Sequence, residues 1–160
     1  MKIIRPLALI VLVLGIIGIV LGGVFIGEGL AKNNLIVDRM KVEKVSLALD
    51  PNNPQQLTPV TSSASAQAAA DKIAADRRAI APTYQDLLNM TNGRFDPTND
   101  KELSYAQAMN LENYLYLAVT AFGLTQSVMG TGVYMFITGL AVFLIGFLVF
   151  KIAGRLNIAT

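Results

Sequence analysis

The chain has 160 residues, of which 53% are hydrophobic and only 15% are charged, with a formal net charge of +2. Soluble domains average about 25% charged residues, so this balance favours a membrane protein. The chain contains no cysteine and no histidine, which excludes disulfides and removes the commonest metal ligands and the usual neutral-pH acid–base group. Basic and acidic residues are mixed along most of the chain, unlike the single-sign blocks of nucleic-acid binders. We therefore expect no metal, no other cofactor and no nucleic-acid partner.

The first apolar segment covers residues 7–27, LALIVLVLGIIGIVLGGVFIG, and carries no charge. As a helix it extends about 30 Å, the thickness of a hydrocarbon core. A cleaved signal peptide is the alternative, with Lys2 and Arg5 as its basic start. The apolar run exceeds the usual 7–15 residues of such a peptide, which favours an uncleaved transmembrane helix.

The following residues are expected to leave the membrane. Residues 28–40 continue the first helix outward, and the alternation in KVEKVSLAL (41–49) favours a short β-strand. The segment DPNNPQQLTPV (50–60) holds three prolines and reads as a loop.

An alanine-rich helix is predicted next, from residue 62 to Pro82. Its small side chains suit close packing against another helix. Thr83 then caps a short helix over 83–90, and Gly93 and Pro97 mark a turn.

The last helix is predicted to run from about 100 to 152. Asn99 and Glu102 have the spacing of a capping box, and Ser104 with Gln107 offers a later start. The preceding DPTND (96–100) clusters oxygen ligands that hard cations favour, but it lacks the length and spacing of a calcium loop. A turn followed by a helix cap is the better interpretation.

Between Glu112 and Lys151 the chain has thirty-eight uncharged residues, about 57 Å of continuous helix. A bilayer core absorbs only about 30 Å, so we place the second span at 130–150 and its apolar front outside the membrane. That front should be covered by the rest of the chain or by a neighbouring copy. The rival interpretation breaks the helix at Gly123, or at Gly130 and Gly132. The predicted interface residues are Tyr114, Leu117, Phe122 and Leu124.

Both spans carry glycine at helical spacing, with GIVLG (18–22) and GVFIG (23–27) matching GxxxG. Small residues let membrane helices approach closely. The pattern leaves open whether each span packs on the other or on a second copy. The predicted helix-packing residues are Gly15, Gly18, Gly22, Gly132, Gly139 and Gly146.

The two ends carry only positive charge, with Lys2 and Arg5 before the first span and Lys151 and Arg155 after the second. The positive-inside rule then places the tails 1–6 and 151–160 in the cytoplasm and residues 28–129 outside, in a protein of the cytoplasmic membrane. Neither span contains an ionisable residue, which disfavours an ion path or a proton relay.

The segment AAADKIAADRRAIAPTYQDLL…GRFDP…AMNLENYLYLAVTAFGL, within residues 68–130, resembles a group of uncharacterised small two-span membrane proteins from Chloroflexi and actinobacteria. The resemblance implies the same two-span topology. Some members are labelled aromatic ring-opening dioxygenases. Enzymes of that kind have metal-dependent folds that are rich in histidine, whereas this chain has no histidine. No functional residue carries over.

The sequence therefore predicts an all-α membrane protein with two outward-extended transmembrane helices and a helical extracytoplasmic domain. The leading hypothesis is a non-enzymatic protein that associates with itself or serves as an accessory subunit of a membrane complex. The alternative is an extracytoplasmic sensor of a lipid or small ligand that signals through a partner protein.

Overall fold

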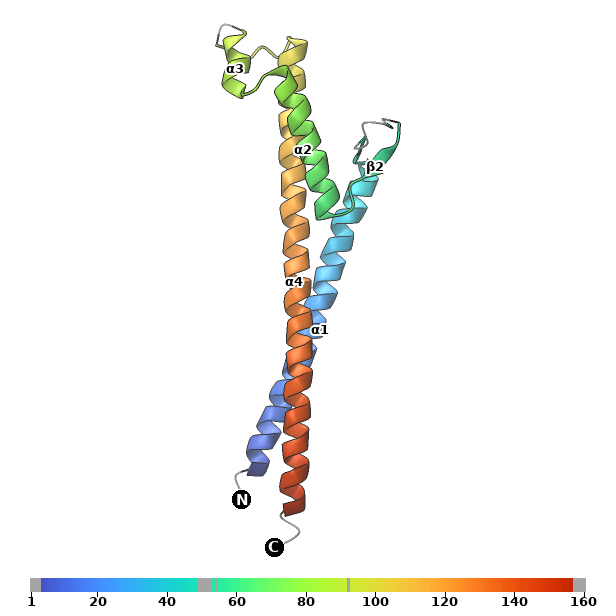
Figure 1. Cartoon of the computed structure of the whole chain (residues 1–160), viewed down its shortest axis with the longest axis vertical. Helices are drawn as coiled ribbons and strands as arrows, with labels where there is room; N and C mark the ends of the chain where they lie inside the picture. The colour runs from blue at the N-terminus through green and yellow to red at the C-terminus, as the bar shows by residue number, and fades with distance from the viewer. Residues whose placement is uncertain (1–3, 49–52, 54, 92, 157–160) are drawn as a thin grey trace. The chain divides into compact units, whose positions relative to one another are not determined.

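The computed structural model describes residues 4–48, 53, 55–91 and 93–156. The elements in order are α1 (Ile4–Val42), β1 (Ser46–Ala48), β2 (Leu57–Pro59), α2 (Ser63–Ile80), α3 (Tyr84–Asn89) and α4 (Asp100–Leu156) (Figure 1). The protein is mostly helical, and α1 and α4 are long and apolar enough to cross a membrane. The rival interpretation of a broken last helix is wrong, because α4 continues through Gly123, Gly130 and Gly132.

The chain divides into two compact units. The helix-pair unit holds α1 up to Asn33 and α4 from Thr125 onward, and the middle unit lies between Asn34 and Leu124.

In the helix-pair unit, α1 and α4 run antiparallel, since Gly15 faces Phe143 while Gly29 faces Met129. The buried residues of α1 recur every seven positions. A seven-residue repeat is shorter than two full α-helical turns, so a pair that keeps it winds into a left-handed supercoil. The repeats are Ala8, Gly15, Gly22 and Gly29 on α1, and Gly132, Gly139, Gly146 and Ala153 on α4.

Most large apolar side chains of the helix-pair unit point away from the seam. Leu14 is 56% exposed and Ile145 is 58% exposed, and many of their neighbours are similar. Contiguous apolar surface on this scale is rare in soluble monomers. Such a surface is typical of helices that face a bilayer.

In the middle unit, α2 packs against α4 through alanines. Ala66, Ala69 and Ala70 have no exposed surface, and they share a core with Leu115 and Phe122. Because alanine adds only a methyl group, the two helix backbones approach closely. Ile36, Val37 and Met40 of α1 complete this cluster.

The starts of α2 and α3 are fixed by side chains that accept hydrogen bonds from otherwise unpaired N–H groups. Ser62 caps α2 by accepting from the backbone N–H of Ser65, and the Ser65 hydroxyl accepts in return from Ser62. Thr83 caps α3 in the same reciprocal way with Asp86. The Thr83 cap explains why α3 begins directly after Pro82, and that proline ends α2 because the residue before a proline disfavours the helical conformation.

The end of α1 departs from the expected strand at 41–49, because the helix continues to Val42. Lys44 adopts a left-handed conformation (φ 50°), and the N–H groups of Lys44 and Val45 donate to the carbonyls of Lys41 and Met40. This is the Schellman arrangement that terminates helices, with lysine where glycine is usual. Among the residues of this stretch that the structure describes, Ser46–Ala48 form the strand β1.

The expected loop at 50–60 is also wrong in part, because Leu57–Pro59 forms β2 and pairs antiparallel with β1. Proline has no backbone N–H, so in a sheet it occurs only where the strand need not donate a hydrogen bond to its neighbour. Pro59 stands opposite Ser46 at the end of this short pair. Residues 49–52 and 54 lie outside the described part of the chain.

A second small core covers the start of α4. Ala81, Leu87 and Tyr105 are buried together, with Ile80 and Met109 packed against them. This cluster holds α3 against the first turns of α4.

Candidate functional site

All six predicted packing glycines lie where α1 and α4 meet in the helix-pair unit. A Cβ added at Gly18 would lie 2.9 Å from Cα of Gly139, and one added at Gly22 would lie 2.5 Å from the backbone N of Phe136. The atoms that these added Cβ atoms would meet belong to the backbone of α4, which cannot rotate away as a side chain can. The three glycines on α4 meet α1 in the same way, with Gly132 on Ile26, Gly139 on Ile19 and Gly146 on Leu12, and Gly15 meets Phe143.

The second GxxxG motif behaves differently from the first. A Cβ added at Gly23 or Gly27 would meet nothing within 4 Å. Spacing alone does not distinguish the two motifs, because they lie on different faces of one helix and only the partner decides which face is used. The glycine stripes of the two spans are thus already matched within one chain.

The four predicted interface residues of α4 divide into two groups. Phe122 is fully buried, in the alanine-rich core of the middle unit. Tyr114, Leu117 and Leu124 are 69%, 63% and 66% exposed. The chain therefore covers one side of this apolar segment and leaves the other side open. We call Tyr114, Leu117 and Leu124 the exposed α4 face.

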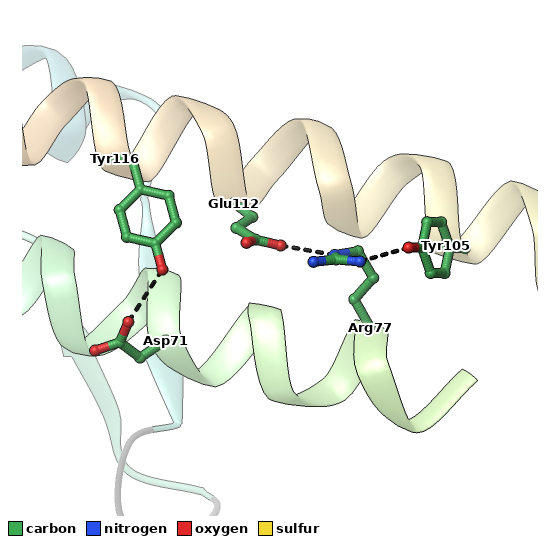
Figure 2. Close-up of polar contacts among 5 residues, drawn as sticks. All are labelled: Asp71, Arg77, Tyr105, Glu112 and Tyr116. Atoms are coloured by element: carbon green, nitrogen blue, oxygen red, sulfur yellow. Dashed lines mark hydrogen bonds and ion pairs between the residues drawn. The ribbon is translucent and has the colours of Figure 1, made fainter. Parts of the chain in front are cut away.

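A polar cluster joins α2 to α4, and none of its residues is among the predicted site residues (Figure 2). Nε of Arg77 donates to the Glu112 carboxylate at 2.7 Å, and Nη1 donates to the Tyr105 hydroxyl at 2.5 Å. The guanidinium also lies 5.0 Å from the centroid of the Tyr105 ring. Both charged side chains are nearly buried, with 12% and 11% exposure. The hydrogen bond to Glu112 is the main reason that the pKa of Arg77 is raised.

One sequence signal could have indicated this pair. Glu112 is the last acid before thirty-eight uncharged residues, and its turn of α4 packs inward. An acid at such a position requires a cationic partner. The sequence does not specify whether Arg77 or Arg78 supplies it.

A second contact between the same two helices involves Tyr116, whose hydroxyl donates to the Asp71 carboxylate at 3.1 Å (Figure 2). This hydrogen bond to Asp71 raises the pKa of Tyr116. The contact is exposed, so its contribution to stability is small. It adds a second polar contact between α2 and α4.

An open groove of about 420 Å³ adjoins the Arg77 cluster. Its lining mixes charged, aromatic and apolar side chains. Nη2 of Arg77 makes no hydrogen bond to any residue that the structure describes. The main lining residues are Arg77, Arg78, Tyr84, Tyr105, Met109 and Glu112.

The DPTND segment forms a turn and a helix start. The Asp96 carboxylate accepts hydrogen bonds from the hydroxyl (2.6 Å) and the N–H (2.9 Å) of Thr98. The hydroxyl of Thr98 is the main reason that the pKa of Asp96 is lowered. In the described part of the chain, no group of three or more acidic, histidine or cysteine side chains is arranged to hold a metal ion.

The capping box predicted for Asn99 and Glu102 at the start of α4 is only half formed. Asn99 does cap the helix, accepting from the N–H of Lys101 at 3.0 Å. Glu102 reaches past Asn99 and accepts from the N–H of Asp96 at 2.7 Å. Glu102 is 1% exposed, and its Oε1 is buried without a hydrogen-bond partner among the described residues. The carboxylate thus ties the preceding turn to the helix.

No protein family, curated protein or solved structure matches this chain.

Proposed function

We propose that the protein is an integral protein of the cytoplasmic membrane whose spans lie at about 7–27 and 130–150. The support is the length and apolarity of α1 and α4 and the exposed apolar surface of the helix-pair unit. Charge sets the orientation: the ends carry only basic residues, which favours termini in the cytoplasm and residues 28–129 outside.

We further propose that the protein acts by association rather than by catalysis, as a self-associating protein or an accessory subunit of a membrane complex. The exposed α4 face carries this proposal. Tyr114, Leu117 and Leu124 are each more than 60% exposed, while the opposite side of the same helix segment is packed in the core. Water around such a face is unfavourable by roughly 25 cal/mol per Å² of apolar surface.

The spacing of this face suits a second helix. Tyr114, Leu117, Ala121 and Leu124 follow one another at intervals of three, four and three residues, the repeat of a helix–helix seam. Residues 113–124 carry no charge, so two copies meet without like-charge repulsion. The glycine stripes contribute little to association between chains, because each is used within its own chain.

Single-cysteine crosslinking tests the proposal directly, because the natural chain has no cysteine. We expect Leu117→Cys to form a disulfide-linked dimer in native membranes. Ala75→Cys, on an exposed position of α2, is the matched control and should remain monomeric. Native mass measurement in mild detergent gives the copy number. A lone monomer together with uncrosslinked Leu117→Cys would contradict self-association, and a co-purifying partner would then identify the accessory role.

A second candidate function is the sensing of a small ligand or lipid outside the membrane, with the signal passed to a partner protein. The supporting observation is the groove beside Arg77, whose volume of about 420 Å³ falls within the range of small-ligand sites. Bound small molecules seen by native mass spectrometry, and lost in a Tyr84→Ala variant, would favour this function over association alone.

A further inference from the structure

Three cations gather at one end of the helix-pair unit. Arg5 lies in the first turns of α1, and its guanidinium is 5.3 Å from the centroid of the Phe150 ring on α4. A Cβ added at Gly154 would lie 4.0 Å from Nη2 of Arg5. Arg5 therefore reaches across to the last turns of α4, where Lys151 and Arg155 are also exposed.

These cations have no acidic partner in the described part of the chain. The ion pairs there involve Lys41, Lys72 and Arg77 only. The sequence has no acid in residues 1–27 or 113–160. Three positive charges at this end are thus available to an anion.

An apolar groove of about 160 Å³ begins beside the same cations. It exists because Ala8 and Gly146 are too small to fill the space between the helices. Apolar cavities of about 150 Å³ accommodate a molecule the size of benzene, so the groove has room for several methylene groups. Its lining is entirely apolar: Ile4, Leu7, Ala8, Val11, Ile145, Gly146 and Val149.

We propose that this end of the helix-pair unit binds one anionic phospholipid. The phosphate group lies among Arg5, Lys151 and Arg155, and part of an acyl chain occupies the groove. A basic cluster beside a membrane span attracts anionic headgroups, and an adjoining apolar groove adds a contact that a free phosphate ion lacks. The inference rests on the proposed membrane insertion.

A second copy of the chain is a poorer occupant. A second copy offers no acidic group to these cations, because the sequence has no acid in residues 1–27 or 113–160. A copy in the same orientation would also bring three more cations to the same level of the membrane. An anionic lipid matches both the charge and the shape.

Tryptophan fluorescence provides the test, because the natural chain has no tryptophan. Leu7 lies at the rim of the groove and is 54% exposed, so the tryptophan of a Leu7→Trp variant stands beside the groove on the lipid side and leaves its interior open. Val24→Trp is the matched control, since this position is also 54% exposed. Each variant is reconstituted with brominated phosphatidylglycerol or brominated phosphatidylcholine, and quenching gives the relative affinity of the two lipids. At Leu7→Trp we expect phosphatidylglycerol to be preferred about five-fold, and at Val24→Trp we expect no preference.

Substitutions in the Leu7→Trp background separate charge from shape. Replacing Arg5, Lys151 and Arg155 together by glutamine should abolish the preference, while Lys32→Gln should leave it unchanged. Val149→Phe fills the groove without altering charge and should reduce the preference at least two-fold. A preference that survives Val149→Phe unchanged would overturn the groove as the acyl-chain site.

The control outcomes distinguish this inference from the proposed function. Equal quenching by both lipids at Leu7→Trp overturns the anionic-lipid site but leaves membrane insertion intact. Absence of quenching by either lipid overturns both membrane insertion and the lipid site.

Discussion

Gly18 and Gly139 pack backbone against backbone: a Cβ on Gly139 would lie 2.6 Å from the N atom of Ile19, and one on Gly18 would lie 2.9 Å from Cα of Gly139. Neither helix can accept even a methyl group here without moving apart. Because bilayer lipids are as apolar as the side chains, such close approach is a main source of attraction between helices. The glycine repeat therefore sets the separation of α1 and α4.

Neighbouring glycines on α1 provide a matched test of this packing. Gly22→Ala places a methyl group 2.5 Å from backbone N of Phe136, so we expect it to destabilise the helix pair by about 1–3 kcal/mol. Gly23→Ala enters open space and should be neutral or stabilising by up to about 1 kcal/mol. Energy transfer between dyes on Leu9→Cys and Leu148→Cys, followed during unfolding in SDS, measures the difference. Equal effects of the two substitutions would contradict the packing.

The Arg77–Glu112 pair should be strongly coupled. Removing one partner leaves a nearly buried charge, so Arg77→Met and Glu112→Leu should each cost about 3 kcal/mol. The double variant should cost much less than the sum, because no charge remains unpaired. Thermal unfolding followed by circular dichroism in detergent measures the cycle, and additive effects would show that the pair is not coupled.

Phe122 and Leu124 are close in sequence but should behave differently. Phe122→Ala removes a fully buried ring and should lower stability by about 3–5 kcal/mol. Leu124→Ala, at a position that is 66% exposed, should change stability by less than about 0.5 kcal/mol while weakening association. Thermal unfolding and native mass measurement on the same samples separate the two effects. If Leu124→Ala lowered the stability of the protein as much as Phe122→Ala does, Leu124 would belong to the core and not to the association surface.

The turn before α4 should respond to acid through Asp96. The hydroxyl of Thr98 lowers the pKa of Asp96 in the folded protein, so the stabilisation is present above the ordinary pKa of an aspartate and is lost as pH falls through the lower folded pKa. Thr98→Val removes the hydroxyl donor and should raise the pKa of Asp96, so that this loss begins at higher pH. Thr98→Ser keeps the donor and is the control. Carboxyl carbon chemical shifts give both pKa values, and an unchanged value in Thr98→Val would contradict the role of the hydroxyl.

The end of α1 offers a stabilising substitution. Lys44 has φ 50°, where a residue with a Cβ is less stable than glycine by about 1 kcal/mol. Lys44→Gly should therefore raise the free energy of unfolding by about that amount. Lys41→Gly, inside the last turn, should lower it by a similar amount. The melting temperatures of the two variants should move in opposite directions.

Hydropathy and local capping are properties that the sequence determines alone. Unbroken apolar runs predict two long helices, because a helix satisfies its own backbone hydrogen bonds whatever surrounds it. The alanine-rich helix, its end at Pro82 and the cap at Thr83 follow from side chains within a few residues of each other. For the same reason the sequence predicts the start of α4 near residue 100. It does not predict which backbone N–H group donates to Glu102.

Tertiary structure decided which of several equivalent faces is used. Gly18–Gly22 and Gly23–Gly27 have the same spacing, yet only the first pair meets α4. Phe122 and Leu124 are equally apolar, yet only Phe122 is covered. The pairing of Arg77 with Glu112 likewise depends on how α2 is rotated against α4. Periodicity specifies faces within one helix, whereas burial depends on where a distant segment of the chain comes to lie.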